Sequence, residues 1–243
     1  MRRQASTERG ASGGRYGPAG RTAILLVFLL LMTIITGAAA ESTPGSGFSR
    51  NPAAIETAAA SAVRLEVYDR DGNRIGTGSG FAAFEPAVLV TAAHVIVNMD
   101  HMIATKDDGT TFRIDRAYDA DTDADVAICE LPEDAGLPPL KWSREAPARG
   151  EPATAIGSQF GLINLVTMGN VCGRWEAGGV NWILFTAPVS GGSSGGPLLN
   201  DEGSVMGVIT GTYDKAQNLN LAAPYEAAAK LYGTDNDEGG TSK

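Results

Sequence analysis

A short glycine-rich stretch between two apolar segments constrains this chain more than any other feature. Residues 191–199 read Gly-Gly-Ser-Ser-Gly-Gly-Pro-Leu-Leu, and the apolar runs 182–186 and 205–210 on either side are typical of β-strands. Glycines on both sides of a small hydroxyl residue favour a tight turn whose backbone N–H groups converge beside the hydroxyl. Most Gly-Ser runs are flexible loops, which is the alternative interpretation. We take Ser194 as a candidate nucleophile.

A histidine and an aspartate occupy positions that suit such a nucleophile. The sequence holds two histidines, and His94 closes an apolar run over residues 87–93 whose small residues leave room for an imidazole. Asp125 opens the apolar run 126–131, so its carboxylate is expected at the edge of the core, where it can orient an imidazole. The remaining acids of this segment are predicted to lie in solvated loops, with Asp123 as the second candidate partner for the histidine; they are Asp115, Asp119, Asp121 and Asp123.

Three motifs together resemble those of trypsin-fold (chymotrypsin-like) serine proteases. They are Thr-Ala-Ala-His at 91–94, Asp-Val-Ala-Ile at 125–128 and Gly-Ser-Ser-Gly-Gly-Pro at 192–197. The order His, Asp, Ser is that of this fold and differs from the order in subtilisins and α/β-hydrolases. The compact spacing, and residues 218–224 ahead of an Ala-rich segment, are most similar to bacterial HtrA/Deg-type proteases. The resemblance covers residues 55–232.

The resemblance implies an all-β fold of two six-stranded Greek-key β-barrels with a short C-terminal helix. Recurrent short apolar runs and 31 glycines independently favour an all-β protein, whereas the two-barrel arrangement comes from the family. The Pro-rich, charged segment 132–150 is the expected crossover between the barrels. Short helices are expected at 55–62, at 94–98 and at 225–231, and the last of these would close the domain.

The resemblance also assigns roles to individual residues. Ser194 would attack a peptide carbonyl, His94 would transfer the proton, Asp125 would orient the imidazole, and the N–H groups of Gly192 and Ser194 would form the oxyanion hole. In this fold the residue six before the nucleophile lies at the base of the substrate pocket. The expected pocket residues are Pro188, Val189, Ser190, Thr210, Gly211 and Thr212.

None of these pocket residues is acidic, so a basic substrate side chain would remain unpaired and we predict a preference for small or medium apolar residues. No cofactor is expected. The two histidines, His94 and His101, lack neighbouring ligands at metal-binding spacing, so no metal site is predicted, and His101 is interpreted as a solvated loop residue.

The sequence departs from the family in two respects. Ser193 stands where Asn or Asp commonly precedes the nucleophile, which argues against activation through a new N-terminus that pairs with an acid. About 200 residues remain beyond the first 40, enough for one two-barrel domain and no appended peptide-binding (PDZ) domain. The HtrA style of regulation and trimeric assembly is therefore not expected to transfer.

The N-terminal segment has the composition of an export signal. Five arginines and one acid precede the uncharged apolar run 23–36, and small residues follow at 37–40. Residues 1–40 are thus predicted to be a signal peptide cleaved after Ala40, with an uncleaved signal anchor as the alternative. Either outcome places the protease domain outside the cytosol: periplasmic, extracellular or anchored facing out. Residues 41–54 are interpreted as a linker and 233–243 as a disordered acidic tail.

The charge balance restricts the partners. The whole chain carries a net charge of −9, and loss of the leader's five Arg and one Glu leaves 14 basic and 27 acidic residues, a net of −13. Such acidity argues against nucleic acid and anionic membrane surfaces, so polypeptide substrates are the expected partners. Membrane attachment is expected only if the apolar segment is retained, and the oligomeric state is not predicted.

Two cysteines, Cys129 and Cys172, form an even number in a chain with an export signal, which normally favours a disulfide. Both lie in apolar strand-like segments, and the resemblance assigns them to different barrels. A disulfide requires Cα atoms within about 7 Å of each other. We therefore favour two buried thiols over a bridge.

The sequence as a whole predicts an exported serine endopeptidase that works through a His-Asp-Ser triad and an acyl-enzyme. Two alternatives stay open. One is a catalytically silent binding protein that keeps the protease fold, because a fold does not guarantee an activity. The other is a hydrolase that acts on esters or another acyl group, with the same chemistry and a different pocket.

Overall fold

The computed structural model describes residues 51–85, 87–213 and 216–233. The predicted signal peptide or anchor, most of the predicted linker and nearly all of the predicted acidic tail lie outside these residues. Within the described part of the chain, no helix has both the length and the apolar character needed to cross a membrane.

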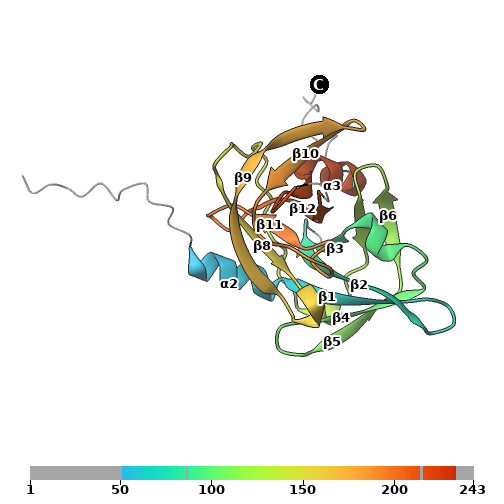
Figure 1. The fold of residues 1–243 in the computed structure, drawn as a ribbon. Helices are drawn as coiled ribbons and strands as arrows, with labels where there is room; N and C mark the ends of the chain where they lie inside the picture. Colours follow the sequence, from blue (N-terminus) through green and yellow to red (C-terminus); the bar gives the residue numbers. More distant parts are fainter. Residues whose placement is uncertain (1–50, 86, 214–215, 234–243) are drawn as a thin grey trace, which may run out of the picture. The chain divides into compact units, whose positions relative to one another are not determined.

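The first half of the described chain forms an antiparallel seven-stranded sheet in the order β5-β4-β1-β2-β3-β7-β6 (Figure 1). Alternating burial along β1 matches the alternation of apolar and polar residues that the sequence shows there. The strands are β1 (Ala62–Tyr68), β2 (Arg74–Ala83), β3 (Val88–Thr91), β4 (His101–Thr105), β5 (Thr111–Ile114), β6 (Ala117–Asp121) and β7 (Val126–Cys129).

The second half forms a closed barrel of six strands in the order β10-β13-β12-β11-β8-β9. Its interior is apolar and includes Val171, Phe185, Leu198 and Ile209. The strands are β8 (Pro152–Gly157), β9 (Leu165–Ala177), β10 (Val180–Phe185), β11 (Pro197–Leu199), β12 (Val205–Thr212) and β13 (Asn220–Pro224).

The all-β, two-sheet architecture predicted from the sequence is confirmed, with one difference. The first sheet is a half-barrel of seven strands, because no ladder joins its edge strands β5 and β6 among the described residues. Strand β6 reads Ala-Tyr-Asp-Ala-Asp, and four of its five residues are exposed. Closing the barrel through β6 would cover part of this polar strand and remove its carboxylates from water, which costs desolvation.

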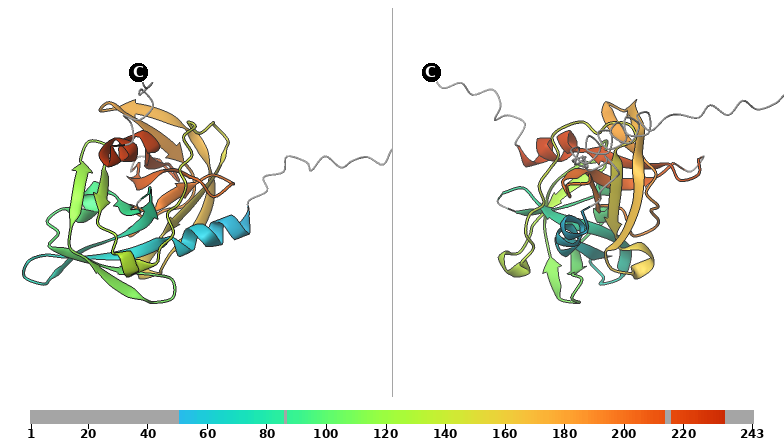
Figure 2. Two further views of the ribbon diagram at one scale, coloured as in Figure 1. Left: turned by 180° about the vertical axis from the view of Figure 1, so that it is seen from behind. Right: turned by 90° about the vertical axis from the view of Figure 1, so that its left-hand side faces the viewer.

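Two α-helices accompany the sheets on well-separated sides, as Figure 2 shows from two directions. Helix α2 (Pro52–Ala60) begins inside the segment predicted to be a linker, because the Asn51 side chain accepts the N–H groups of Ala53 and Ala54 and proline suits the first helical position. Helix α3 (Tyr225–Tyr232) ends at Gly233, whose φ of 80° is left-handed. Three short 3₁₀ helices are η1 (Ala93–Ile96), η2 (Glu133–Ala135) and η3 (Gln159–Gly161).

One apolar cluster joins the two sheets. Phe81, Val90 and Ile128 of the first sheet pack with Leu199 and Val208 of the barrel. Helix α3 adds small buried alanines to this cluster, and it contacts both β7 and β12. The seam between the sheets, which also carries the candidate site, therefore rests on a shared core.

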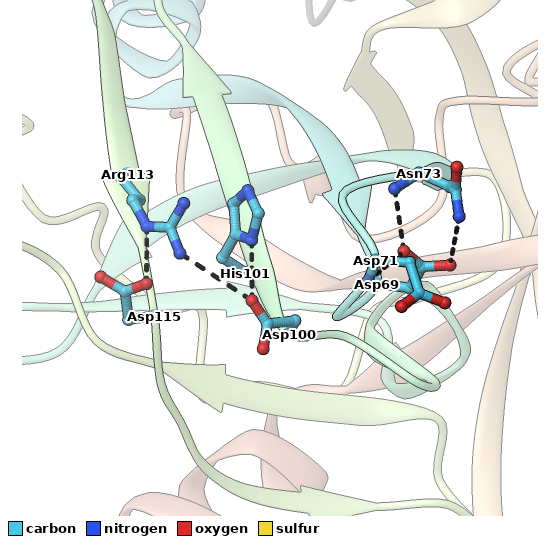
Figure 3. Close-up of polar contacts among 7 residues, drawn as sticks. All are labelled: Asp69, Asp71, Asn73, Asp100, His101, Arg113 and Asp115. Atoms are coloured by element: carbon cyan, nitrogen blue, oxygen red, sulfur yellow. Dashed lines mark hydrogen bonds and ion pairs between the residues drawn. The ribbon is translucent and has the colours of Figure 1, made fainter.

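The prediction that His101 lies in a solvated loop is wrong. His101 opens β4, where the register places it opposite Tyr68, and the two rings stack with centroids 5.1 Å apart. Its Nδ1 lies 3.0 Å from a carboxylate oxygen of Asp100, which also faces Arg113 at 3.9 Å. Figure 3 shows this cluster beside the turn that Asp69 closes by accepting the N–H groups of Asp71 and Asn73.

Two smaller predictions also need correction. Asp119 and Asp121 lie in β6 and not in loops, because that strand pairs with β7 and leaves its polar side chains in solvent. The two cysteines are free thiols in different sheets, but only Cys129 is buried. Cys172 is exposed because β9 at this point directs every second side chain outward, between buried Val171 and Gly173.

Candidate active site

The structure joins His94 to Asp125 through two hydrogen bonds. Asp125 lies in the turn before β7 with a left-handed φ of 54°. Its carboxylate accepts the His94 backbone N–H at 2.9 Å and lies 2.8 Å from Nδ1 of the ring. An ionised carboxylate accepts the Nδ1 proton, and this tautomer leaves the Nε2 lone pair available as a base. Asp123, the second candidate, is instead part of the turn in which its backbone N–H donates to Asp121.

The contact with Asp125 also sets the charge preference of the imidazole. The hydrogen bond to the carboxylate raises the pKa of His94 above its ordinary value of 6.5, and the negative charge of Asp125 adds to this effect. Partial burial opposes it by disfavouring the charged ring. The His94 side chain is half exposed, so Nε2 can be reached from solvent.

The Ser194 turn requires its glycines. Gly192 and Gly195 have left-handed φ values of 99° and 86°. A side chain at Gly195 would collide with the carbonyl of Ser79, the hydroxyl of Thr91 and the N–H of Ala92. The Ser194 turn therefore lies directly against residues 91–92, which lead into η1 and His94, so the candidate nucleophile and base share the seam between the sheets.

Ser79, which sequence reasoning missed, ties this turn to the first sheet. Its backbone N–H donates to the carbonyl of Ser194 at 2.8 Å, and its buried hydroxyl donates to the carbonyl of Gly192 at 2.7 Å. The same hydroxyl accepts the N–H of Ser158 at 2.8 Å. The Gly-Ser-Gly-Phe segment of β2 is the only sequence signal that could have identified Ser79 as a site residue. The partners of Ser79 lie far along the chain, so neighbouring residues do not reveal them.

The two predicted oxyanion donors differ from their neighbours in hydrogen bonding. The N–H of Ser193 donates to Ser190 at 2.9 Å, and that of Gly195 donates to Ile209 at 2.7 Å. Across the described ranges, the N–H groups of Gly192 and Ser194 make no hydrogen bond to the protein. Both donors thus lack a protein acceptor, as an oxyanion hole requires.

The Ser194 hydroxyl donates to the carbonyl of Thr210 at 3.3 Å, a long hydrogen bond. In this conformation the hydroxyl proton is not directed at His94. A serine hydroxyl can occupy other staggered positions about χ1, and hydrogen bonds of catalytic groups are often long in the absence of substrate.

A cavity of about 210 Å³ opens beside Ser194. Four predicted pocket residues, Val189, Ser190, Gly211 and Thr212, line it together with three that were not predicted: Gly191, Ser193 and Ile209. Among the residues that line it, none carries a charge. Its side walls come from β12 and from the segment that precedes the Ser194 turn.

The other two predicted pocket residues lie nearby but do not line this cavity. Pro188 borders a neighbouring cavity of about 320 Å³, and its carbonyl accepts hydrogen bonds from Thr167 and Gln159. Thr210 contributes the carbonyl that holds the Ser194 hydroxyl. Gln159, another residue that sequence reasoning missed, also accepts the Ser190 hydroxyl at 2.9 Å and so fixes one wall of the pocket.

Nothing in the described residues provides a metal site, since no group of three or more His, Cys, Asp or Glu side chains converges there. A larger cavity, about 600 Å³, is lined mostly by polar and charged residues of the segment before β8 and of the turn after β11, and none of the predicted site residues borders it.

The described residues form a half-barrel and a barrel. A His–Asp pair and a serine flanked by glycines lie at the seam between them, and this combination defines the class of trypsin-fold proteins. The family described as "Trypsin-like peptidase domain" matches residues 78–208, which is more than half of the chain, and the chain therefore belongs to this family. The resemblance predicted from the three motifs is confirmed.

Individual relatives point within this family to the HtrA type. The chain is 31% identical over 196 residues to "Serine protease HTRA1B" of Danio rerio, covering 75% of this chain and 40% of the relative. It is 34% identical over 170 residues to "Putative serine protease HhoB" of Synechocystis sp., covering 66% and 40%. The crystal structure of the serine endoprotease from Yersinia pestis superimposes with a TM-score of 0.65 at 25% identity, over 76% of this chain and 66% of that one. The chain spans about two fifths of the length of these curated relatives.

Proposed function

We propose that this protein is a serine endopeptidase that hydrolyses peptide bonds through an acyl-enzyme on Ser194. The observation that carries the proposal is the bonded His94–Asp125 pair at the same seam as a serine turn whose Gly192 and Ser194 N–H groups have no acceptor in the described protein. Relatives that share this fold are named as serine proteases, which supports the same reaction.

The first step forms the acyl-enzyme. Ser194 Oγ attacks the carbonyl carbon of the substrate while His94 Nε2 takes the hydroxyl proton, and the imidazolium that results is stabilised by Asp125. The carbonyl electron pair becomes an oxyanion that the N–H groups of Gly192 and Ser194 receive. His94 then gives its proton to the leaving amine. In the second step water attacks the acyl carbon while His94 Nε2 takes its proton. The bond between the acyl carbon and Ser194 Oγ then breaks, His94 returns the proton to Oγ, and the carboxylic acid is released.

The pocket beside Ser194 supports a preference for a small or medium apolar residue before the scissile bond. Its volume of about 210 Å³ and its uncharged lining exclude a paired contact for Lys or Arg. A basic side chain in this cavity would lose its hydration without gaining a counter-charge.

We further propose that the protein acts outside the cytosol. The support is the arginine-rich leader and the apolar run 23–36, which lie outside the described residues. The mature N-terminus of the exported protein, determined by mass spectrometry, distinguishes cleavage after Ala40 from a retained anchor. Full-length protein in the cytosolic fraction would contradict the proposed location.

Labelling with a fluorophosphonate probe tests the nucleophile directly. The wild-type protein is expected to be labelled and to cleave an unbiased peptide library after apolar residues, whereas Ser194→Ala should do neither. Circular dichroism of Ser194→Ala controls for folding. Cleavage after Arg would overturn the proposed pocket, and the absence of both labelling and cleavage would overturn the activity.

The catalytically silent alternative has one observation in its favour, since the Ser194 hydroxyl donates to Thr210 and not to His94. A binding protein of this kind would bind polypeptides yet resist the probe. The ester-hydrolase alternative is separated by comparing the turnover of a peptide with that of an ester of the same acyl group.

A further inference from the structure

The turn between β8 and β9 presents an exposed phenylalanine next to the Ser194 turn. The Phe160 side chain is 84% exposed, and its backbone has a left-handed φ of 52°. Its N–H donates to the carbonyl of Gly191 at 3.2 Å. A non-glycine residue with left-handed backbone angles carries a conformational free-energy cost, so the surrounding structure must hold it there. Such positions cluster at functional sites.

The turn is anchored at both ends although its tip is exposed. The buried Asn164 amide donates to the carbonyls of Ala59 and Ala62 at 3.1 and 2.8 Å, at the join of α2 and β1. At the other end the N–H of Ser158 donates to Ser79, and the Gln159 side chain bonds to the wall of the pocket. Phe160 is therefore a fixed surface feature.

Sheet order determines on which side of the nucleophile Phe160 lies. The Ser194 turn leads into β11, which has β12 on one side and β8 on the other. The pocket wall formed by Ile209, Gly211 and Thr212 belongs to β12, whereas β8 leads into the Phe160 turn. The Phe160 turn therefore lies on the side of Ser194 away from this wall, where the part of a substrate beyond the scissile bond can lie when the residue before that bond fills the pocket.

From this arrangement, and on the basis of the proposed endopeptidase activity, we propose that Phe160 is an apolar contact for the substrate residue that follows the scissile bond. Covering an exposed aromatic ring with a bulky apolar side chain is favourable, because both lose apolar surface to water. Leu162, which is 59% exposed two residues on, extends this contact. The preferred substrates are polypeptides with a bulky apolar residue after the cut.

The proposal is tested with two quenched fluorescent peptides. They differ only in the residue that follows the scissile bond, which is Phe in one peptide and Ser in the other. Wild-type protein should favour the Phe peptide about ten-fold in kcat/KM, in line with the burial of one large apolar side chain. Phe160→Gly, which tolerates the left-handed backbone, should bring this ratio close to one. Tyr118→Gly, at an exposed aromatic residue of β6, is the matched control and should keep the wild-type ratio.

The outcomes are distinguishable from failure of the proposed function. An unchanged ratio in Phe160→Gly, or an equal loss on both peptides, overturns the proposal and leaves the endopeptidase activity standing. If the wild-type protein cleaves neither peptide, the fluorophosphonate probe and the peptide library decide whether the endopeptidase activity fails, and peptide binding tests the role of Phe160. Fluorescence anisotropy of the Phe peptide is then compared in Ser194→Ala with and without Phe160→Gly. A dissociation constant at least ten-fold larger in the variant that also carries Phe160→Gly supports the contact, and an equal dissociation constant overturns it.

Discussion

At the scale of single residues, the charge state of His94 links the site to pH. Its pKa is raised by the hydrogen bond to Asp125, and only the neutral ring can accept the Ser194 proton. We expect kcat/KM to rise with pH through a midpoint above 6.5. Asp125→Asn should lower that midpoint and, as in other triads, reduce kcat by about four orders of magnitude. A pH–rate profile with a midpoint below 6.5 in the wild-type protein would contradict this assignment.

The same pKa shift affects folding stability in the opposite direction: activity rises with pH, whereas this contribution to stability falls. Because the pKa of His94 is higher in the folded than in the unfolded protein, the charged ring stabilises the fold below pH 6.5. This contribution is lost as the pH rises through the folded pKa. Since the side chain is half exposed, solvent screening keeps the effect small.

Ser79 offers a second test at this scale. Ser79→Ala removes the donor to Gly192 and the acceptor for Ser158, and an unmet buried hydrogen bond costs about 1–3 kcal/mol. We expect a lower free energy of unfolding in urea and a lower kcat, because the peptide after Gly192 is no longer fixed. Ser61→Ala is the control: this serine is also buried, but its hydroxyl donates to Thr57 of α2, so kcat should stay at the wild-type value. Equal kcat in the two variants would refute the role of Ser79.

At the scale of elements, the two cysteines report on the strands that carry them. Cys129 in β7 is buried, and burial raises the pKa of its thiol to about 12, whereas Cys172 in β9 is exposed. A thiol reagent at pH 8 should modify Cys172 in the native protein and both residues in denaturant, because the thiolate reacts. Modification is counted by mass spectrometry, with Cys172→Ser as the control. No modification in denaturant without reductant would instead indicate a disulfide between the two cysteines.

At the scale of the whole molecule, the cluster across the seam couples the two sheets. Phe81 of β2 is fully buried among residues of both sheets. Phe81→Ala should cost about 3–5 kcal/mol, as for other large-to-small core substitutions, and the two sheets should still unfold in one transition. Calorimetry and tryptophan fluorescence check this prediction. Two separate transitions would show that the sheets are stable independently.

How far prediction succeeded depends on how local each feature is. The all-β class, the helix before residue 233 and the turn around Ser194 follow from neighbouring residues, because glycine, proline and alternating apolar residues restrict the backbone directly. The start of α2 at Pro52 was missed although its cap at Asn51 is visible in the sequence. The half-barrel was missed because family likeness gives a strand count but not which edges pair.

By itself the sequence determined the three candidate catalytic residues: a histidine at a strand end, an aspartate that opens a strand and a serine between glycines. Tertiary structure alone decided what surrounds them. Ser79 meets Gly192 across 113 residues, and Gln159 meets Ser190 across 31. Such contacts depend on sheet register and on how two sheets meet, and a change of register by one residue would direct each side chain to the opposite face. Local backbone preferences do not contain that information.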